Sequence, residues 1–182
     1  MIAVMSIELL ESLRNFPHAS RSFAAGAFVF HRNDTVETLH AVRSGSIRLV
    51  RYQADGQTAV LQRAAAGDIF AEASVFSPSY HCDGIAMTDA ETEAYAITDI
   101  QRLLDTDVRF CHAWALAMSH QLQAARRRAE LVSLRTVSER LDAWLTWHEG
   151  EMPVKGDWKG VAEEIGVSPE AFYRELAARR KR

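Results

Sequence analysis

Apolar residues in the first hundred positions change their spacing at about residue 21. Before this point Ile7, Leu10 and Leu13 recur at helical intervals, which predicts a short amphipathic helix over residues 7–14. After it, apolar residues come in short runs separated by turn residues, up to about residue 98. Many short strands at near-regular spacing predict a sandwich, barrel or roll of β-strands. The predicted strands cover residues 27–30, 39–42, 46–52, 58–62, 85–87 and 94–97.

Two predicted turns that contain glycine separate strands in this region. Asp55-Gly56 separates two predicted strands and is a strong hairpin signal, because glycine tolerates the positive φ that such turns require. Ala66-Gly67-Asp68 predicts a second turn further along the chain. The turns support a strand-rich unit rather than a helical one.

Beyond residue 98 the apolar positions follow a helical period. Residues 99–104 predict a short helix, and residues 107–148, which contain neither glycine nor proline, predict a long one. A long helix gains its stability mainly by packing an apolar face, so it needs something to pack against. A second copy of the same helix is a common partner, and we therefore expect a homodimer. The apolar stripe begins with Trp114, Met118, Leu122, Ala125 and Ala129.

A breaker cluster at residues 149–153 ends the helical run, and the best-defined motif follows in residues 157–182. Gly166 suits the left-handed conformation that closes a helix. Ser168-Pro169-Glu170 is typical of a helix N-terminus, since Ser caps free amides, Pro fits the first position and Glu favours the positive end of the dipole. The two helices predict a helix-turn-helix, whose second helix enters a DNA major groove. Its expected core is Val161, Ala162, Ile165, Val167, Phe172 and Leu176.

The exposed front of the second helix is expected to read bases. Glu170 can accept from a cytosine amino group, Arg174 can bind guanine through two hydrogen bonds, and Tyr173 lies on the same face. The plainer alternative is an ordinary helical hairpin with a capped second helix, and Glu175 stands where an apolar residue would seat the helix better. The ordered set of residues favours DNA reading. The DNA backbone is expected to contact Ser168, Arg179, Arg180, Lys181 and Arg182.

Composition and the motifs that are missing restrict the classes of protein to which this sequence can belong. The net charge of -3 gives no general attraction to nucleic acid, so binding would rest on local positive runs at residues 126–128 and 179–182. Two cysteines, Cys82 and Cys111, are too few for a disulfide framework or for the four thiolates of an ordinary iron–sulfur cluster, which favours a reducing cytoplasm. No apolar run is long enough to predict a membrane span. We expect no enzyme, because the Gly-rich phosphate loop, the nucleophile elbow and the His-Glu metal helix do not occur.

The order of these parts resembles the Crp/Fnr family, named after the cyclic AMP receptor protein and the fumarate-nitrate-reduction regulator. The resemblance rests on residues 42–49, 55–56, 66–76 and 131–145, together with the pair Glu170 and Arg174. It implies an α+β chain in three parts. These are an N-terminal β-roll sensor domain of the cyclic-nucleotide-binding, jelly-roll type (1–105), a long dimerisation helix (106–136) and a helix-turn-helix DNA-binding domain (137–182).

The resemblance also implies partners. A homodimer would form through the long helix and bind a palindromic site in double-stranded DNA, with Glu170 and Arg174 reading each half. An effector in the roll would change the relative pose of the DNA-binding domains, and RNA polymerase is the further partner expected. The family usually continues into a small β-hairpin wing, which residues 175–182 do not supply; we expect this to affect DNA affinity more than DNA geometry.

The predicted effector pocket departs from the cyclic-nucleotide pattern. Ala71-Glu72 stands where relatives that bind cyclic AMP carry a Gly-Glu pair, and Cys82-Asp83 stands where they carry Arg-Ser. Ala73 and Ser74 follow in the same expected pocket segment. Losing the Arg bond to the cyclic phosphate costs about 1.5–3 kcal/mol, and a carboxylate beside its place has the wrong charge for a phosphate. Ala125 and Arg126 align with the pair that usually contacts adenine, and Ala125 has no side-chain hydrogen-bonding group. We therefore expect an effector other than cyclic AMP, although Arg126 offers one alternative source of positive charge.

His81-Cys82-Asp83 supports a second hypothesis. His and Cys can ligate haem iron or another transition metal, and Cys82 could act as a redox-sensing thiol. The protein would then be a ligand-binding module, or a haem or redox sensor, with weak or lost DNA binding. Adjacent strand residues point to opposite faces, however, so both cannot readily bind one metal. We favour a small buried Cys82 and a loop His81, and we predict no metal site.

Overall fold

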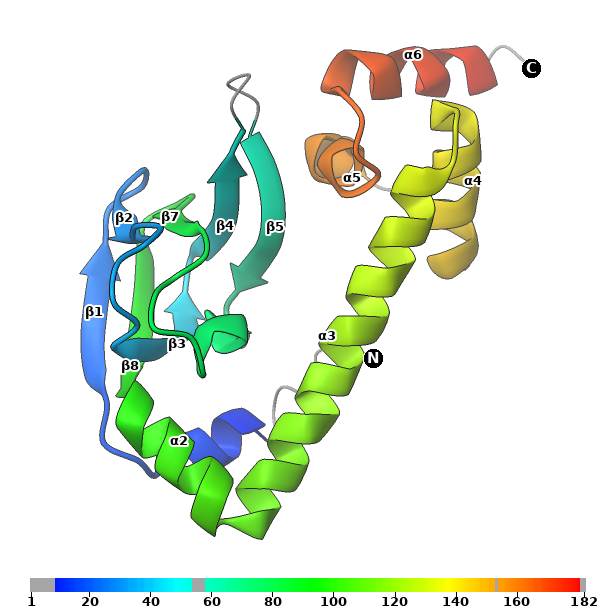
Figure 1. Ribbon diagram of the computed structural model, residues 1–182. Helices are drawn as coiled ribbons and strands as arrows, with labels where there is room; N and C mark the ends of the chain where they lie inside the picture. Colours follow the sequence, from blue (N-terminus) through cyan, green and yellow to red (C-terminus); the bar gives the residue numbers. More distant parts are fainter. Residues whose placement is uncertain (1–8, 54–57, 153, 181–182) are drawn as a thin grey trace. The chain divides into compact units, whose positions relative to one another are not determined.

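The computed structural model describes residues 9–53, 58–152 and 154–180, and the chain divides into two compact units (Figure 1). The first unit is residues 1–118 and the second is residues 119–182. The predicted domain limits at residues 105 and 136 remain predictions. The predicted Asp55-Gly56 turn lies outside the described residues, as does the beginning of the predicted N-terminal helix.

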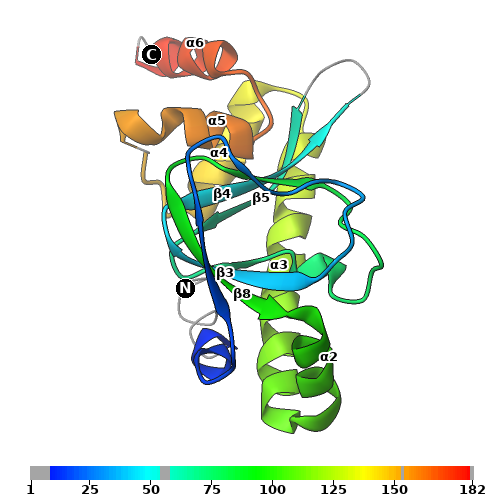
Figure 2. The same ribbon diagram turned by 90° about the vertical axis from the view of Figure 1, so that its left-hand side faces the viewer.

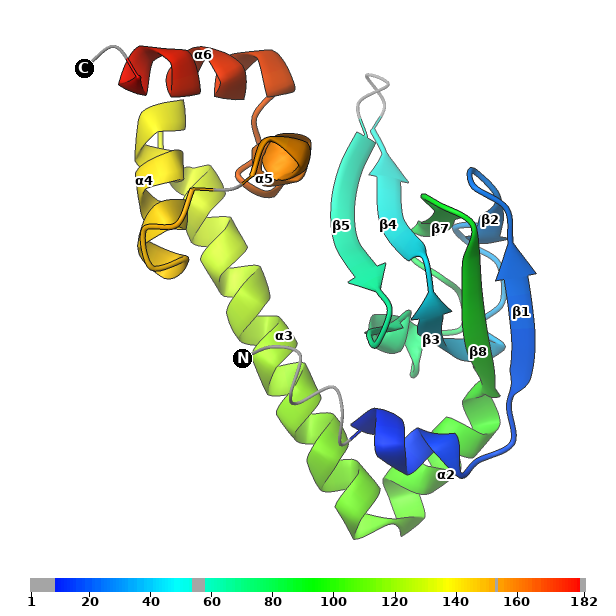
Figure 3. The same cartoon turned by 180° about the vertical axis from the view of Figure 1, so that it is seen from behind.

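The described part of the first unit contains two antiparallel sheets of four strands each, most of whose strands are labelled in Figure 3. One sheet has the order β1-β8-β3-β6 and the other β2-β7-β4-β5. The sequence prediction of a strand-rich unit is confirmed, but β1, which begins before residue 21, and the two-residue β6 were missed. The strands are β1 Ala19–Phe23, β2 Phe28–Phe30, β3 Thr38–Ser44, β4 Ser46–Tyr52, β5 Thr58–Ala65, β6 Ile69–Phe70, β7 Asp83–Ala86 and β8 Ala90–Ala96.

The strand β3 is buried on both faces. Its alternating side chains separate two cores, because successive residues of a strand point to opposite sides. Leu39 and Ala41 enter the core shared with the helices, and Val42 enters the core between the two sheets. The predicted turn at residues 66–68 is present, with Gly67 at φ +94° and the Asp68 carboxylate accepting from the Ala65 backbone N–H at 2.9 Å.

Helices cover one end of the first unit. The helix α2 (Ile97–Thr106) continues directly from β8 and is followed by α3 (Val108–Ser133), as Figure 2 shows. A helical segment at residues 9–14 joins them through Leu9 and Leu13, which are fully buried. Phe110 and Trp114 of α3 belong to this core, so Trp114 packs inside the unit and is not part of an exposed stripe.

The long helical run predicted over residues 107–148 is interrupted. The helix α3 ends at Ser133 and α4 (Val137–Trp147) begins after Thr136. Thr136 accepts from the Glu139 backbone N–H at 3.1 Å, and the Glu139 carboxylate accepts from the Thr136 N–H at 2.9 Å. This reciprocal capping box starts a new helix. The prediction of one continuous helix was therefore wrong.

The second unit packs three further helices around the end of α3. The helix α5 (Trp158–Glu164) and the helix α6 (Pro169–Arg179) are joined by a turn containing Gly166, and both contact α4 or each other. The described residues also include two short 3-10 turns, η1 (Glu72–Ser74) in the first unit and η2 (Lys155–Asp157) in the second. The core of the second unit is Leu131, Leu141, Trp144, Val161, Ala162, Ile165, Phe172 and Leu176.

Candidate effector pocket and nucleic-acid interface

The predicted phosphate-binding segment opens on a strained residue. Ala71 precedes η1 at φ +69°, in the left-handed region that favours glycine, and its side chain is buried. The turn is closed by the Ser74 N–H, which donates to the Ala71 carbonyl at 3.0 Å. Alanine therefore adopts a conformation that favours glycine, at the position where the sequence resemblance expects a glycine. Ala73 is exposed and Ser74 is buried.

A buried carboxylate, that of Glu72, lies close enough to the buried thiol of Cys82 for its charge to act on that thiol. Glu72 is buried, and its carboxylate accepts from the Gln62 side-chain amide at 3.5 Å. Cys82 is 2% exposed and belongs to the core between the sheets. Burial, helped by the charges of Asp83 and Glu72, raises the pKa of the Cys82 thiol to about 11. A thiol with this pKa is protonated at pH 7, whereas redox chemistry needs the thiolate.

The other two residues of the His81-Cys82-Asp83 run face different partners. The Asp83 carboxylate accepts from the Arg32 backbone N–H at 2.9 Å and lies 3.6 Å from Nδ1 of His31. His81 is exposed, with Nδ1 lying 3.1 Å from the Ser74 hydroxyl. The three neighbours therefore do not converge on one point. Among the described residues no group of three His, Cys, Asp or Glu side chains is placed to hold a metal ion.

The remaining pocket residues predicted from sequence are on α3. Ala125 and Arg126 are both exposed and belong to the second unit. Their contact with an effector remains a prediction.

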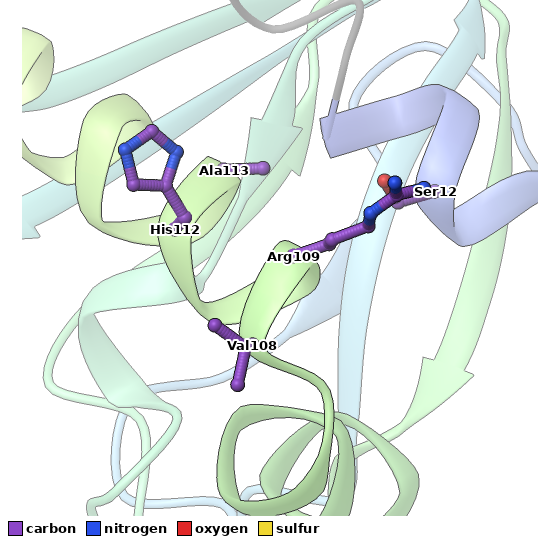
Figure 4. Close-up of a pocket in the computed structure, with 5 residues that line it drawn as sticks. All are labelled: Ser12, Val108, Arg109, His112 and Ala113. Atoms are coloured by element: carbon purple, nitrogen blue, oxygen red, sulfur yellow. The ribbon is translucent and has the colours of Figure 1, made fainter.

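A hollow that the sequence did not indicate lies in the first unit, between the helical segment at 9–14 and the first turns of α3 (Figure 4). It has a volume of about 460 Å³. The Arg109 side chain reaches toward Ser12, and His112 stands on the next turn of α3 (Figure 4). The lining residues are Ser12, Val108, Arg109, His112 and Ala113.

A buried polar network centred on His40 was also not predicted. Its Nε2 lies 2.8 Å from the Thr38 hydroxyl, its Nδ1 lies 3.3 Å from the Thr92 hydroxyl, and its ring stacks on Phe70. Tyr80 completes the network by donating to the Thr38 carbonyl at 2.8 Å. Burial first, and then the charge of Arg21, lower the pKa of His40 to about 4. His40 is therefore neutral at pH 7 and acts as a core residue.

In the second unit, the start of α6 is held by its predicted cap. The Ser168 hydroxyl accepts from the Ala171 N–H at 3.2 Å, and Pro169 takes the first helical position. Glu170, Tyr173 and Arg174 are exposed, whereas the side chain of Phe172 is fully buried. The pKa of Glu170 is lowered by hydrogen bonds from its own backbone N–H and the Ser168 hydroxyl and by the charge of Arg174, so the carboxylate is charged.

The two described arginines at the basic end of α6 have different surroundings. Arg179 is bonded to Asp142, Glu175 and Ser138 within the second unit. Arg180 is exposed and its guanidinium lies 5.6 Å from the centre of the Trp158 ring. Glu175, which looked misplaced in the sequence, is accommodated by its ion pair with Arg179 at 2.8 Å. Lys181 and Arg182 lie outside the described residues.

Arg140 of α4 is a structural residue that sequence reasoning missed. Its guanidinium donates to the carbonyls of Val132 and Leu134 at the end of α3, each at 2.9 Å. It also donates to the carbonyls of Ile165 and Gly166 at the end of α5, at 3.1 and 3.0 Å. One side chain therefore satisfies carbonyls that two helix ends would leave without partners. No pattern in the neighbouring sequence signals these contacts.

The comparisons with known proteins begin with the first unit. Residues 20–107 match the family model of the cyclic nucleotide-binding domain. A search of curated protein sequences finds no match. No helix in the described part of the chain combines the length and apolar character needed to span a bilayer.

Three solved structures share the fold of most of the chain. FixK2 from Bradyrhizobium japonicum is 17% identical with a TM-score of 0.74, over 91% of this chain and 86% of that one. CLP from Xanthomonas campestris, a global regulator that responds to c-di-GMP, is 21% identical with a TM-score of 0.68, over 98% and 92%. A CRP-family transcriptional regulator from Thermus thermophilus, TTHB099, is 19% identical with a TM-score of 0.64, over 88% and 84%.

These findings agree with the resemblance inferred from the sequence. The matched domain and the shared fold place the antiparallel β-sandwich before a long helix, as in the similar regulators. Residues 20–107 thus form a cyclic nucleotide-binding domain, and most of the chain shares its fold with these transcription regulators.

Proposed function

We propose that this protein is a dimeric, sequence-specific regulator of transcription that binds double-stranded DNA through α6. The observation that carries the proposal is the division of α6 into two faces. Phe172 and Leu176 are buried against α4 and α5, while Glu170, Tyr173 and Arg174 are exposed beyond a capped N-terminus. A helix-turn-helix presents its second helix to the major groove in this way. The carboxylate and the guanidinium then supply complementary base-reading groups.

The proposed dimer forms through an apolar seam on α3. Eight apolar side chains follow an unbroken spacing of three and four residues, which is the heptad pattern of a coiled coil. The side chains of Val108, Leu122 and Val132 are 84%, 52% and 43% exposed, so a second helix could still cover these apolar positions. The seam consists of Val108, Cys111, Ala115, Met118, Leu122, Ala125, Ala129 and Val132.

The charges beside the seam are compatible with a parallel pair of helices. In a parallel coiled coil, the residue that directly precedes the first seam position of a heptad (position g) faces the residue five positions later in the partner helix (position e). This register places Gln121 opposite Arg126 and Arg128 opposite Ser133 of the second copy. Like charges are thereby kept apart. A parallel pair also presents two copies of α6 on the same side, as a palindromic site requires.

The proposed effector is a small molecule other than cyclic AMP. The Cys82 side chain, where relatives have Arg, is a buried neutral thiol, and the closest ionisable neighbours include the carboxylates of Glu72 and Asp83. A cyclic phosphate would thus lose the cation at this position and meet the added carboxylate of Asp83, although the charge of Arg51 also reaches this thiol. The observed environment of Cys82 also weighs against the haem or redox alternative. RNA polymerase remains the further partner proposed from the family.

The deciding experiment is selection of bound sequences from random double-stranded DNA. We expect an enriched palindrome whose half-site centres lie about one helical turn, or roughly 10 base pairs, apart. Glu170→Ala and Arg174→Ala should each relax selectivity at one position of each half-site, because each removes one base contact. Lys159→Ala, which alters an exposed residue of α5, serves as the control. Failure to enrich any sequence, with and without small molecules from a cell extract, would refute sequence-specific binding.

A further inference from the structure

Arg179 stands in the last turn of α6, at the start of the basic run, yet its guanidinium is directed into the second unit. The Nε atom donates to the Glu175 carboxylate at 2.8 Å, and Nη1 donates to the Asp142 carboxylate at 2.6 Å. The Nη2 atom donates to both the backbone carbonyl and the hydroxyl of Ser138, at 3.0 and 3.1 Å. All three nitrogens of the guanidinium are therefore engaged.

The charge around Arg179 does not favour a phosphate. One guanidinium lies between two carboxylates, those of Asp142 and Glu175, so the three side chains together carry a net charge of about −1. A DNA phosphate approaching this cluster would meet no free cation. The next residue offers a contrast, because Arg180 is exposed and lies over the Trp158 ring. Adjacent arginines thus have different physical roles.

The contacts of Arg179 connect α6 with the first turn and a half of α4. Ser138 and Asp142 lie one helical turn apart on α4, so the fork of the guanidinium spans two successive turns of that helix. A planar group bound at several points restrains rotation of α6 about its own axis more than a single apolar contact does. That rotation decides where Glu170, Tyr173 and Arg174 point.

We propose that Arg179 is a positioning residue for base reading, which sets the rotation of α6 on α4, rather than a contact to the DNA backbone. This inference rests on the proposed function. It replaces, for Arg179 alone, the phosphate role expected from the basic run. Arg180 keeps the phosphate role.

The two roles differ in how binding depends on salt. A side chain that neutralises one phosphate contributes about one unit to the slope of log K against log salt concentration, whereas a positioning residue contributes none. The test uses the full chain and the best DNA site from the selection experiment. Affinity for that site and for a singly mismatched site is measured over a range of salt concentrations for the wild type, R179Q, R179K, R180Q and D142N.

We expect R180Q to reduce the salt slope by about one unit and to keep the preference for the matched site. We expect R179Q to keep the slope and to reduce the ratio of matched to mismatched affinity by up to roughly tenfold, the effect of about one net hydrogen bond. R179K retains the charge but not the planar fork, so it should not restore the ratio. D142N removes a partner of Arg179 on α4 without removing any positive charge, and it should lower the ratio of matched to mismatched affinity in the same way.

The outcomes separate this inference from the proposed function. If the wild type shows no sequence preference, the proposed function fails and this inference falls with it. If the wild type is selective but R179Q lowers the salt slope and leaves the ratio unchanged, only the positioning role is overturned. Circular dichroism checks that each variant is folded. If R179Q does not fold, D142N decides, and unchanged selectivity in D142N overturns the inference.

Discussion

The guanidinium of Arg140 donates to the Gly166 carbonyl at 3.0 Å, across 26 positions of the chain. The same Nη1 atom donates to the Ile165 carbonyl at 3.1 Å. The turn that precedes α6 is thus tied directly to α4. Since α6 carries the proposed base-reading residues, the position of this turn affects the whole interface.

Replacing Arg140 should destabilise the second unit. R140A leaves four carbonyls at the ends of α3 and α5 without their donor, and we expect a loss of about 2–3 kcal/mol in the free energy of unfolding. R140K should recover only part of it, because an ammonium cannot reach all four carbonyls. Urea unfolding with amide hydrogen exchange measures the effect. R135A, at an exposed neighbouring position, is the control, and equal stability of R140A and R135A would contradict the prediction.

Gly166 should tolerate a side chain less well than Gly150. Both residues have positive φ, +69° and +81°, so alanine costs about 1 kcal/mol of backbone strain at either position. At Gly166 the added Cβ would also lie 3.0 Å from Cγ1 of Val132, whereas nothing lies within 4 Å at Gly150. G166A should therefore lower the free energy of unfolding by more than G150A does. Thermal unfolding of the two variants compares them, and a larger effect of G150A would show that the contact with Val132 is unimportant.

Acid should weaken the first unit through His40. The folded pKa of about 4 lies below the unfolded value of 6.5, so the unfolded chain binds the proton first as the pH falls. The contribution of neutral His40 is fully present above pH 6.5 and is lost between pH 6.5 and 4, by about 3 kcal/mol.

The measurement is the pH dependence of urea unfolding for wild type and H40Q. The difference between them isolates His40 from the carboxylates that titrate in the same range. H31Q, at an exposed histidine, should follow the wild type. If H40Q keeps the full slope between pH 6.5 and 4, His40 is not the group responsible.

Mild oxidation should join two copies of the chain through Cys111. This thiol is exposed and lies in the proposed α3 seam, so a parallel pair brings two Cys111 residues face to face. Diamide would accept the two electrons and two protons released as the disulfide forms. We expect a cross-linked dimer in non-reducing electrophoresis of the wild type and of C82S, but not of C111S. A C111S variant that still cross-links, or a monomeric wild type in sedimentation, would contradict the parallel seam.

Patterns within a few residues were sufficient to predict most elements. Most of the strands, the turn at Gly67, the helix cap at Ser168 and the faces of α6 depend on local periodicity and on the conformational preferences of single residues. The break between α3 and α4 was also available locally, since Thr136 and Glu139 have the spacing of a capping box. The absence of Gly and Pro outweighed that signal, and the helix was predicted as continuous.

The sequence alone thus determined the class of fold, the order of its parts and the exposed face of α6, because these follow from local spacing. Only the tertiary structure decided which charged and polar groups are engaged. Arg140 and Arg179 find partners up to 41 positions away, and Cys82 and Asp83, adjacent in the chain, enter different environments. Hydrogen-bond partners depend on how helices and sheets pack, and packing brings together residues whose relation no local pattern records.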